Sequence, residues 1–418
     1  MRARLAAVLA ASVLLAVPLG ASGSSGFVEP VDVLYELHAE QAGTLFGWAV
    51  GELTDIDGDG ATDLIVSAPT YGPALSGRTF VYSGATGDQI YAFSEGLGEF
   101  HGYAIADAGD VDADGTHDII AGARNGNHAY VYSGATGARL LTLSGETPGD
   151  FFGFAVASAG DVDLDGHADL LVGAPRNDAV GLDAGRAYVL SGADGSTLRT
   201  IDGVSAGDLF GSATDWIEDV DGDGRPDHTI GARDGGSFRD GEVTLFSGAT
   251  GAKRWTVGGT KENEDLGWFF VAGVGDVNSD GVADVYGGDF TYSHSGDDRG
   301  AAYVFSGTNG EILRTWYGSS AKQGMGPGRE VGDVDGDGTV DIVAGSYLSP
   351  DGAQKAGKAE IFSGADGSRI RTITNTRRGE QFGFDAVGLG DLSGDGGVDL
   401  VVSAAGGDVV YVFAGDGG

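Results

Sequence analysis

Residues 55–63 read Asp-Ile-Asp-Gly-Asp-Gly-Ala-Thr-Asp, an acidic loop that recurs along the chain. Each copy has aspartate at positions 1, 5 and 9 and glycine at position 6, and five of the seven copies also have aspartate at position 3. Successive copies are separated by 51 to 58 residues. They begin at Asp55, Asp110, Asp161, Asp219, Asp276, Asp333 and Asp391. A unit of this size is too small to bury its own core, so the repeats must stack on their neighbours in one domain.

The residues around each loop repeat as well, which excludes a chance run of aspartates in an acidic protein. Upstream lies Phe-Gly, as at Phe46-Gly47, Phe152-Gly153, Phe210-Gly211 and Phe382-Gly383. Downstream, an apolar run ends in Gly-Ala-Pro or a variant, and a Ser-Gly-Ala-Thr/Asp-Gly turn follows at residues 83–87, 133–137, 191–195, 247–251 and 363–367, with looser copies at 306–310 and 414–418. The repeated unit is therefore longer than the acidic loop.

Each repeat is predicted to form four short strands. In the third copy we expect strands at residues 152–159, 170–173, 186–190 and 197–201, with the acidic loop between the first two. Glycine, asparagine and serine turns separate these segments, and no sustained apolar period of 3.6 residues predicts a helix. The sequence thus indicates an all-β protein.

Seven copies of a four-stranded antiparallel sheet can hide their edges by closing into a ring, which predicts a seven-bladed β-propeller. Residues 33–37 resemble a fourth strand with no blade before it, and the chain ends after a last third strand at residues 409–413. We therefore expect the N-terminal strand to complete the last blade and close the ring. A β-solenoid is the alternative, although it would leave two exposed edges.

The acidic loops have the ligand pattern of calcium sites. Carboxylates at positions 1, 3, 5 and 9 can converge on one cation, and such hard oxygen ligands select calcium over zinc or copper. Without metal, close carboxylates would repel one another by about 4 kcal/mol per pair at an effective dielectric of 20. We therefore expect up to seven Ca²⁺ ions whose binding contributes to folding. The alternative is that these loops are acidic turns that only solvate.

The predicted metal ligands are, loop by loop, Asp55, Asp57, Asp59 and Asp63; Asp110, Asp112, Asp114 and Asp118; Asp161, Asp163, Asp165 and Asp169; Asp219, Asp221, Asp223 and Asp227; Asp276, Asn278, Asp280 and Asp284; Asp333, Asp335, Asp337 and Asp341; Asp391, Ser393, Asp395 and Asp399. Asn278 and Ser393 replace a carboxylate at position 3, so the loops beginning at Asp276 and Asp391 should bind calcium most weakly.

Charge and composition exclude some classes of partner. The net charge is −38, and 26 of the 62 acidic residues lie in the seven loops. A chain this acidic lacks the basic stripe that nucleic-acid binding requires. Cysteine is absent, so disulfides do not hold the fold.

The first 22 residues have the layout of a secretory signal peptide. Arg2 and Arg4 precede an apolar stretch at residues 5–17 and a group of small residues at 20–22. The apolar stretch is too short to span a bilayer stably. These features predict an exported protein, secreted or extracellular, either free or associated with the cell surface, with residues 27–418 forming the propeller.

The combination of Phe-Gly, the acidic loop and Gly-Ala-Pro resembles the FG-GAP repeat family, which includes the N-terminal propellers of integrin α subunits. The resemblance covers roughly residues 31–414. It implies that the acidic loops join the first and second strands of each blade on the lower face, that the aspartates bind calcium, and that ligands meet the upper face. Departures include His101 and Leu266 in the Phe place and Arg124 and Arg233 in the Pro place.

The sequence favours a binding module over an enzyme. It contains no His-Glu-x-x-His, no Gly-x-Ser-x-Gly and no thiol nucleophile. We expect a monomeric adhesion or recognition module for a protein or glycan, with no membrane span and no catalytic residues. The alternatives are a calcium-dependent carbohydrate-active hydrolase or lyase and a structural surface-layer component. Candidate ligand-binding residues on the loops between second and third strands are Tyr71, Arg176, Phe238, Phe290, Tyr292, His294 and Tyr347.

Overall fold

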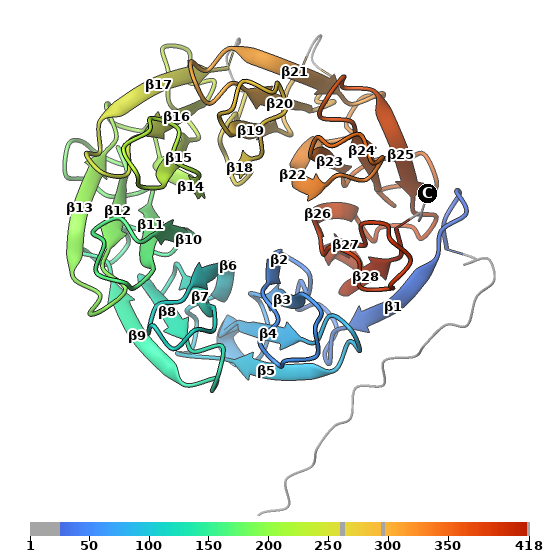
Figure 1. The fold of residues 1–418 in the computed structure, drawn as a ribbon, viewed down its shortest axis with the longest axis horizontal. Coiled ribbons are helices and arrows are strands. Elements are labelled where there is room, and N and C mark those ends of the chain that lie inside the picture. The colour runs from blue at the N-terminus through green and yellow to red at the C-terminus, as the bar shows by residue number, and fades with distance from the viewer. Residues whose placement is uncertain (1–25, 260–263, 294–296, 416–418) are drawn as a thin grey trace, which may run out of the picture.

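A computed structural model describes residues 26–259, 264–293 and 297–415. The predicted signal peptide lies outside the described residues, and the boundaries of the propeller domain stay a prediction. Seven four-stranded antiparallel sheets are arranged in a ring around a central axis, as predicted (Figure 1). Helical structure within the described ranges is limited to two three-residue turns, η1 (Pro73–Leu75) and η2 (Ala405–Gly407). None of the helical segments there is long and apolar enough to cross a membrane.

Each blade runs from an inner strand beside the central axis to an outer strand at the rim (Figure 1). The first three blades comprise β2 (Val50–Leu53), β3 (Asp63–Ala68), β4 (Arg78–Tyr82) and β5 (Gln89–Phe93); β6 (His101–Gly109), β7 (Asp118–Ala123), β8 (His128–Tyr132) and β9 (Arg139–Ser144); β10 (Ala155–Gly160), β11 (Asp169–Ala174), β12 (Arg186–Leu190) and β13 (Thr197–Asp202). The fourth and fifth comprise β14 (Phe210–Ile217), β15 (Asp227–Ala232), β16 (Glu242–Phe246) and β17 (Lys253–Gly258); β18 (Val271–Val274), β19 (Asp284–Asp289), β20 (Ala301–Phe305) and β21 (Ile312–Tyr317).

The sixth blade comprises β22 (Met325–Gly332), β23 (Asp341–Ser346), β24 (Lys358–Phe362) and β25 (Arg369–Thr374). The seventh contains β26 (Phe382–Gly388), β27 (Leu400–Ala404) and β28 (Val409–Phe413), and its outer strand is β1 (Val33–His38). Because β1 pairs antiparallel with β28 from Val33–Phe413 to His38–Val409, the N-terminal strand closes the ring, as predicted (Figure 1).

The first strand of the third blade begins later than predicted. We expected it to start at residue 152, but β10 starts at Ala155. Phe151 and Gly153 have φ of 59° and 83°, and the Phe154 N–H donates to the Phe151 carbonyl, so Phe-Gly forms a turn at the entry to the blade. A Cβ at Gly153 would lie 2.1 Å from the His128 carbonyl oxygen. The glycine is therefore required both by its positive φ and by the close approach of β8 from the preceding blade.

The residue in the Phe place of each repeat packs into the core between neighbouring blades. Phe152, for example, shares a buried cluster with Ile120 of the preceding blade and with Tyr188 of its own blade. All seven residues in this place are buried, namely Phe46, His101, Phe152, Phe210, Leu266, Met325 and Phe382. The same packing is found at the three positions that depart from Phe, which are His101, Leu266 and Met325.

Fourth strands also bind the Ser-Gly turns of the following blade. Tyr35 Oη donates to the Gly84 carbonyl at 2.6 Å, and Trp255 Nε1 donates to the Gly307 carbonyl at 2.7 Å. Trp316 Nε1 donates in the same way to the Gly367 carbonyl at 2.9 Å. The repeated Ser-Gly-Ala-Thr/Asp-Gly turn is thus an inter-blade contact that sequence analysis identified as a repeat without assigning its partner.

Candidate functional site

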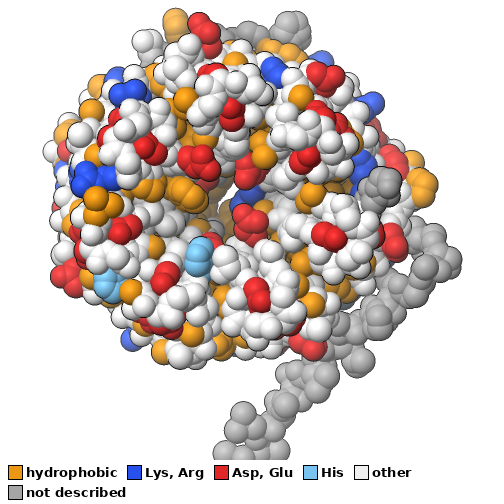
Figure 2. Space-filling model, viewed as in Figure 1, with side chains coloured by type: hydrophobic (Ala, Val, Ile, Leu, Met, Phe, Trp, Pro, Cys, Tyr) orange, Lys and Arg blue, Asp and Glu red, His pale blue; other side chains and the backbone are white. Residues whose placement is uncertain are grey.

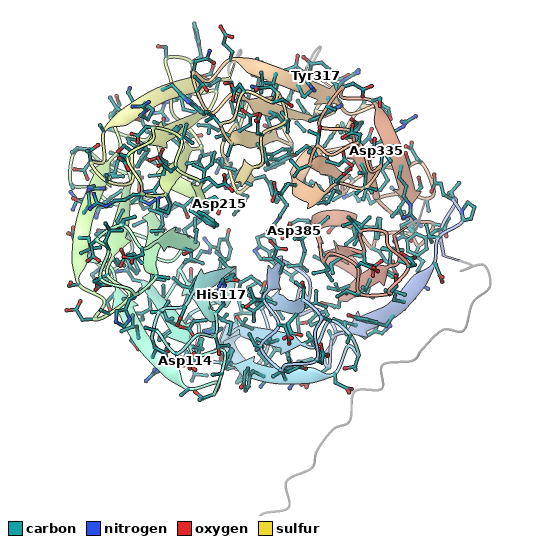
Figure 3. All side chains as sticks on the ribbon, viewed as in Figure 1. Asp114, His117, Asp215, Tyr317, Asp335 and Asp385 are labelled. Carbon is teal, nitrogen blue, oxygen red and sulfur yellow. The ribbon has the colours of Figure 1, made fainter. Side chains whose placement is uncertain are left out.

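The seven acidic loops join the first and second strands of their blades, all at one end of the ring, which we call the lower face. Glycine at position 6 has φ between 85° and 95° in all seven loops, while an added Cβ there would meet no other atom within 4 Å. The left-handed backbone, rather than crowding, therefore selects glycine at this position. Figure 3 labels Asp114 and Asp335 among the loop aspartates.

In the five loops with aspartate at position 3, the side chains at positions 1, 3 and 9 converge. One carboxylate oxygen from each residue lies within 4.8 Å of the other two. These triads are Asp55, Asp57 and Asp63; Asp110, Asp112 and Asp118; Asp161, Asp163 and Asp169; Asp219, Asp221 and Asp227; Asp333, Asp335 and Asp341. Three clustered carboxylates fit a hard divalent cation, a class that includes calcium, magnesium and manganese.

The position 5 side chains are not members of these triads. In the first loop, Asp59 Oδ1 accepts the Ala61 N–H at 2.9 Å and Asp59 Oδ2 accepts the Ser83 hydroxyl at 2.9 Å. This carboxylate links the acidic loop to the Ser-Gly turn of its own blade. Asp59, Asp114, Asp165, Asp223 and Asp337 remain predicted ligands that lie outside the triads.

The position 9 aspartates have a structural role that sequence analysis missed. Asp63 is fully buried, and its two oxygens accept the N–H groups of Ile56 at 2.9 Å and Gly84 at 3.0 Å. Burial raises the pKa of Asp63 to about 6, with neighbouring Asp57 and Asp59 adding to the increase. The same causes raise the pKa of Asp118, Asp169, Asp227, Asp284 and Asp341 to about 6. A cation beside such a carboxylate would favour its charged form.

The two altered loops differ at position 3. Asn278 Oδ1 accepts the Asp280 N–H at 2.9 Å, so this side chain still caps its own turn. The Ser393 hydroxyl donates to Asp399 Oδ1 at 3.3 Å, so it uses one of the two acceptor oxygens of the position 9 carboxylate. Both loops offer fewer carboxylates than the five triads, which supports the prediction of weaker calcium binding at Asp276, Asn278, Asp280 and Asp284 and at Asp391, Ser393, Asp395 and Asp399.

A cavity of about 500 Å³ lies on the central axis, where Figure 2 shows an opening bordered by acidic side chains. Its lining includes an aromatic group in which Trp48 lies 5.5 Å from Tyr103 and Phe154 stacks on Phe269 at 5.4 Å between ring centroids. Phe384 lies 5.0 Å from Trp48 and completes the group. Sequence analysis missed this arrangement, although a signal was present: in four repeats the residue after Phe-Gly or its variant is aromatic and lines the cavity, namely Trp48, Tyr103, Phe154 and Phe384.

Carboxylates on the inner strands also line the cavity, and they tie neighbouring blades together. Asp385 accepts the Val50 N–H at 3.0 Å and pairs with Arg329 at 2.7 Å. Asp215 accepts the Gly273 N–H at 3.0 Å, and its burial raises its pKa to about 7. Figure 3 shows Asp215 and Asp385 beside the central channel. These carboxylates therefore have structural partners.

The upper face carries the loops between second and third strands, and most of the predicted ligand-binding residues lie there. Phe238 is 62% exposed and Arg176 is also exposed. Phe290 and Tyr347 are half-buried and contact each other with ring centroids 6.3 Å apart. Tyr71 is half-buried and donates to Glu40 at 2.6 Å. These five side chains remain accessible from solvent.

Tyr292 and His294 stand apart from the other predicted residues. Tyr292 is only 7% exposed and packs against Tyr317 with ring centroids 5.1 Å apart. The expectation that Tyr292 contributes an exposed contact is therefore wrong, because its ring fills the space beneath the loop. His294 lies outside the described residues.

Comparison with known proteins agrees with this architecture. A model of the FG-GAP repeat matches residues 152–190, which span β10 to β12. Integrin alpha-5 of Xenopus laevis is 36% identical over 164 residues, which is 36% of this chain and 15% of that protein. Integrin alpha-IIb of Mus musculus is 31% identical over 188 residues, covering 37% of this chain and 17% of that protein.

Integrin alpha pat-2 of Caenorhabditis elegans is 32% identical over 212 residues, covering 43% of this chain and 17% of that protein. The chain thus spans less than a fifth of the length of these relatives, with covered shares of 15% to 17%. The chain is a seven-bladed β-propeller with FG-GAP repeat sequence, similar over part of its length to integrin α subunits.

Proposed function

We propose that the protein is an exported, calcium-stabilised adhesion or recognition module that binds a protein or glycan on its upper face. The observation that carries this proposal is the division of the ring into two ends. Carboxylate triads occupy the lower loops, while solvent-accessible aromatic and cationic side chains occupy the upper loops. The similarity to integrin α subunits supports a recognition role for the same scaffold.

Calcium would act in this proposal as a structural ion. Each complete loop offers three converging carboxylates, and the position 9 aspartate connects the loop to the Ser-Gly turn of its blade. An ion held by the triad would fix that connection, so its binding free energy would add to the stability of the blade. The upper loops would then be presented on a rigid ring.

We further propose that the module binds a ligand rather than catalysing a reaction, and that it acts as a monomer outside the cell. In this proposal it does not bind nucleic acid and does not span a membrane. Asp385 and Asp215 at the central cavity accept main-chain N–H groups from neighbouring blades. This engagement supports a structural role for them. The charge of −38 supports the exclusion of nucleic acid.

The proposed function can be tested by screening the purified full chain against an array of extracellular-matrix proteins and glycans in the presence of calcium. We expect at least one ligand whose binding weakens in Phe238→Ala or in the double variant Phe290→Ala, Tyr347→Ala. The matched control is Leu164→Ala, because Leu164 is 63% exposed within a lower-face loop. An array on which the wild-type protein binds nothing would contradict the proposal, as would a loss of binding caused by the lower-face control alone.

A further inference from the structure

Two arginines on the upper face lie against one aromatic ring. The guanidinium carbon of Arg176 is 4.5 Å from the centroid of the Phe151 ring, and that of Arg124 is 5.1 Å from the same centroid. Arg124 also lies 4.0 Å from the ring of Tyr103, which lines the central cavity. We call Arg124 and Arg176, which meet at the Phe151 ring, the guanidinium pair.

Neither guanidinium group has an acidic partner within the part of the chain that the structure describes, although the protein is strongly acidic. Five other arginines that lie over aromatic rings among the described residues are paired with carboxylates. These are Arg78 with Glu40, Arg139 with Glu95, Arg186 with Glu146 and Asp202, Arg233 with Asp265, and Arg377 with Glu36 and Glu380. In addition, Arg124 Nε is buried without a hydrogen-bond acceptor. Buried donors normally have an acceptor, so an acceptor is missing at this place.

The fourth blade shows how an arginine at the same repeat position is paired with a carboxylate of the chain itself. Arg124 and Arg233 both stand where other repeats have the proline of Gly-Ala-Pro. Arg233 lies 3.7 Å from the centroid of a Trp268 ring and pairs with Asp265 at 3.1 Å. Asp265 directly precedes Leu266, which is in the Phe place of its repeat. The chain thus supplies one carboxylate to this arginine from the following blade.

The equivalent of Asp265 beside Arg124 is Phe151, which directly precedes Phe152 in the Phe place of the third repeat. Phe151 cannot accept a hydrogen bond, and Arg176 adds a second positive charge beside the same ring. The second blade therefore repeats the arginine without its carboxylate, and Arg176 directly follows Pro175 in the third blade. A planar guanidinium presents paired donors that match the two oxygens of a carboxylate.

From this comparison we infer that the guanidinium pair binds a carboxylate side chain from an acidic polypeptide segment of a partner. The inference rests on the proposed recognition function and names the chemistry of its ligand. The ligand carboxylate would accept hydrogen bonds from the terminal Nη groups of Arg124 and Arg176. Burial of the Arg124 stem and ring contacts on Tyr103 and Phe151 hold the donors in position, which reduces the conformational entropy lost on binding.

A polypeptide fits the site better than an acidic polysaccharide. Guanidinium groups cover the rings of Tyr103 and Phe151, so the flat aromatic surface that a sugar ring would stack on is already in use. A polyuronate would also need a row of free cations, whereas Arg78 and Arg186 on the same face are paired. One or two carboxylates on a peptide require only the guanidinium pair.

The test uses the full chain at constant calcium and low ionic strength, with fluorescence polarisation as the readout. The probes are a peptide that alternates Gly and Glu, a matched peptide that alternates Gly and Gln, and polygalacturonate. We expect the Glu peptide alone to bind, with affinity reduced about tenfold or more in Arg124→Gln and in Arg176→Gln. Arg124→Lys keeps the charge without the planar donors and should give an intermediate loss.

Arg233→Gln is the matched control, because this arginine is at the same repeat position and is already paired; its affinity for the Glu peptide should be unchanged. Thermal midpoints of all variants establish that each is folded. Equal affinity for the Glu and Gln peptides, or an unaltered affinity in Arg124→Gln, would overturn the inference. Binding of polygalacturonate in place of the Glu peptide would overturn the assignment to a polypeptide.

The outcome also separates this inference from the proposed function. A matrix-protein ligand whose binding is unchanged in Arg124→Gln would leave the recognition function standing and remove the guanidinium pair as its site. Conversely, Arg124-dependent binding of the Glu peptide without any ligand on the array would support the carboxylate site and contradict the matrix-binding role.

Discussion

His101 Nε2 lies 2.8 Å from Tyr132 Oη in the buried contact between the first two blades. His101 occupies the Phe place of the second repeat and is fully buried, and its Nδ1 lies 3.3 Å from Thr79 Oγ1 of the preceding blade. Tyr132 in turn donates to Glu95 at 2.9 Å. A polar chain thus replaces the apolar packing that phenylalanine provides elsewhere.

His101→Phe should reduce the acid sensitivity of the fold. Burial lowers the pKa of His101 to about 3 from 6.5, so the folded state favours the neutral imidazole. Its contribution to stability is complete above pH 6.5 and is lost as the pH falls toward 3, at up to about 1.4 kcal/mol per pH unit. The free energy of unfolding, measured by denaturant titration between pH 7 and pH 5, should fall less steeply in the variant. Because burial also lowers the pKa of His228 to about 4, the free energy of unfolding should keep some dependence on pH in both proteins. Equal slopes would contradict the role of His101.

Two aspartates of the third loop should respond differently to calcium. Asp169 accepts the N–H groups of Val162 at 2.9 Å and Gly192 at 3.0 Å, and an asparagine there would turn an amide donor toward one of them. Asp169→Asn should therefore lower the free energy of unfolding by about 1–3 kcal/mol with or without calcium. Asp163→Asn keeps the turn and should destabilise only the calcium-loaded protein. Equal free energies of unfolding of the two variants in chelator would contradict the structural role of the position 9 aspartate.

Gly153→Ala should be strongly destabilising. Its φ is 83° and the new Cβ would lie 2.1 Å from the His128 carbonyl, so both backbone strain and a main-chain clash oppose it. Gly166→Ala is the control, because φ there is 92° but an added Cβ meets nothing within 4 Å. Thermal unfolding should show a loss of about 1 kcal/mol for Gly166→Ala and a clearly larger loss for Gly153→Ala. Similar losses would show that the approach of β8 from the preceding blade is unimportant.

Phe27→Ala should loosen the closure of the ring. The Phe27 ring packs edge-on against Phe382, Tyr411 and Phe413, with centroids 5.2–5.4 Å away, and residue 27 bridges to Asn375 of the sixth blade. Truncation should cost about 1–3 kcal/mol and speed hydrogen exchange in β1 and β28. Val28→Ala, at a position that is 59% exposed, should leave both unchanged. Unaltered exchange in Phe27→Ala would exclude this contact from ring closure.

Much of the fold could be predicted because the repeat itself carries the information. Spacing gave the number of blades, and the unmatched segments at residues 33–37 and 409–413 predicted the pairing of β1 with β28. The start of β10 was misplaced because Phe152-Gly153, an apolar pair, was interpreted as strand, although the positive φ values of Phe151 and Gly153 make this segment a turn. Local composition does not distinguish the two.

The candidate sites were less predictable, because they depend on contacts between distant segments. Asp63 was interpreted only as a ligand, since its bond to the Gly84 N–H requires a turn 21 residues away. Tyr292 was expected on the surface because loop sequence alone does not show which ring folds inward. The guanidinium pair joins Arg124 and Arg176 through Phe151, and no spacing within one repeat predicts that contact.

The central claim is that calcium bound in the lower loops stabilises the ring, and the thermal midpoint of the full chain in chelator and in millimolar calcium tests it most directly. Ions that bind the folded state a hundredfold above their dissociation constant add about 2.7 kcal/mol per site. With five complete carboxylate triads, we expect a large upward shift of the midpoint in calcium, and a smaller shift when one triad is removed by Asp161→Asn. Equal midpoints in chelator and in calcium would contradict the account.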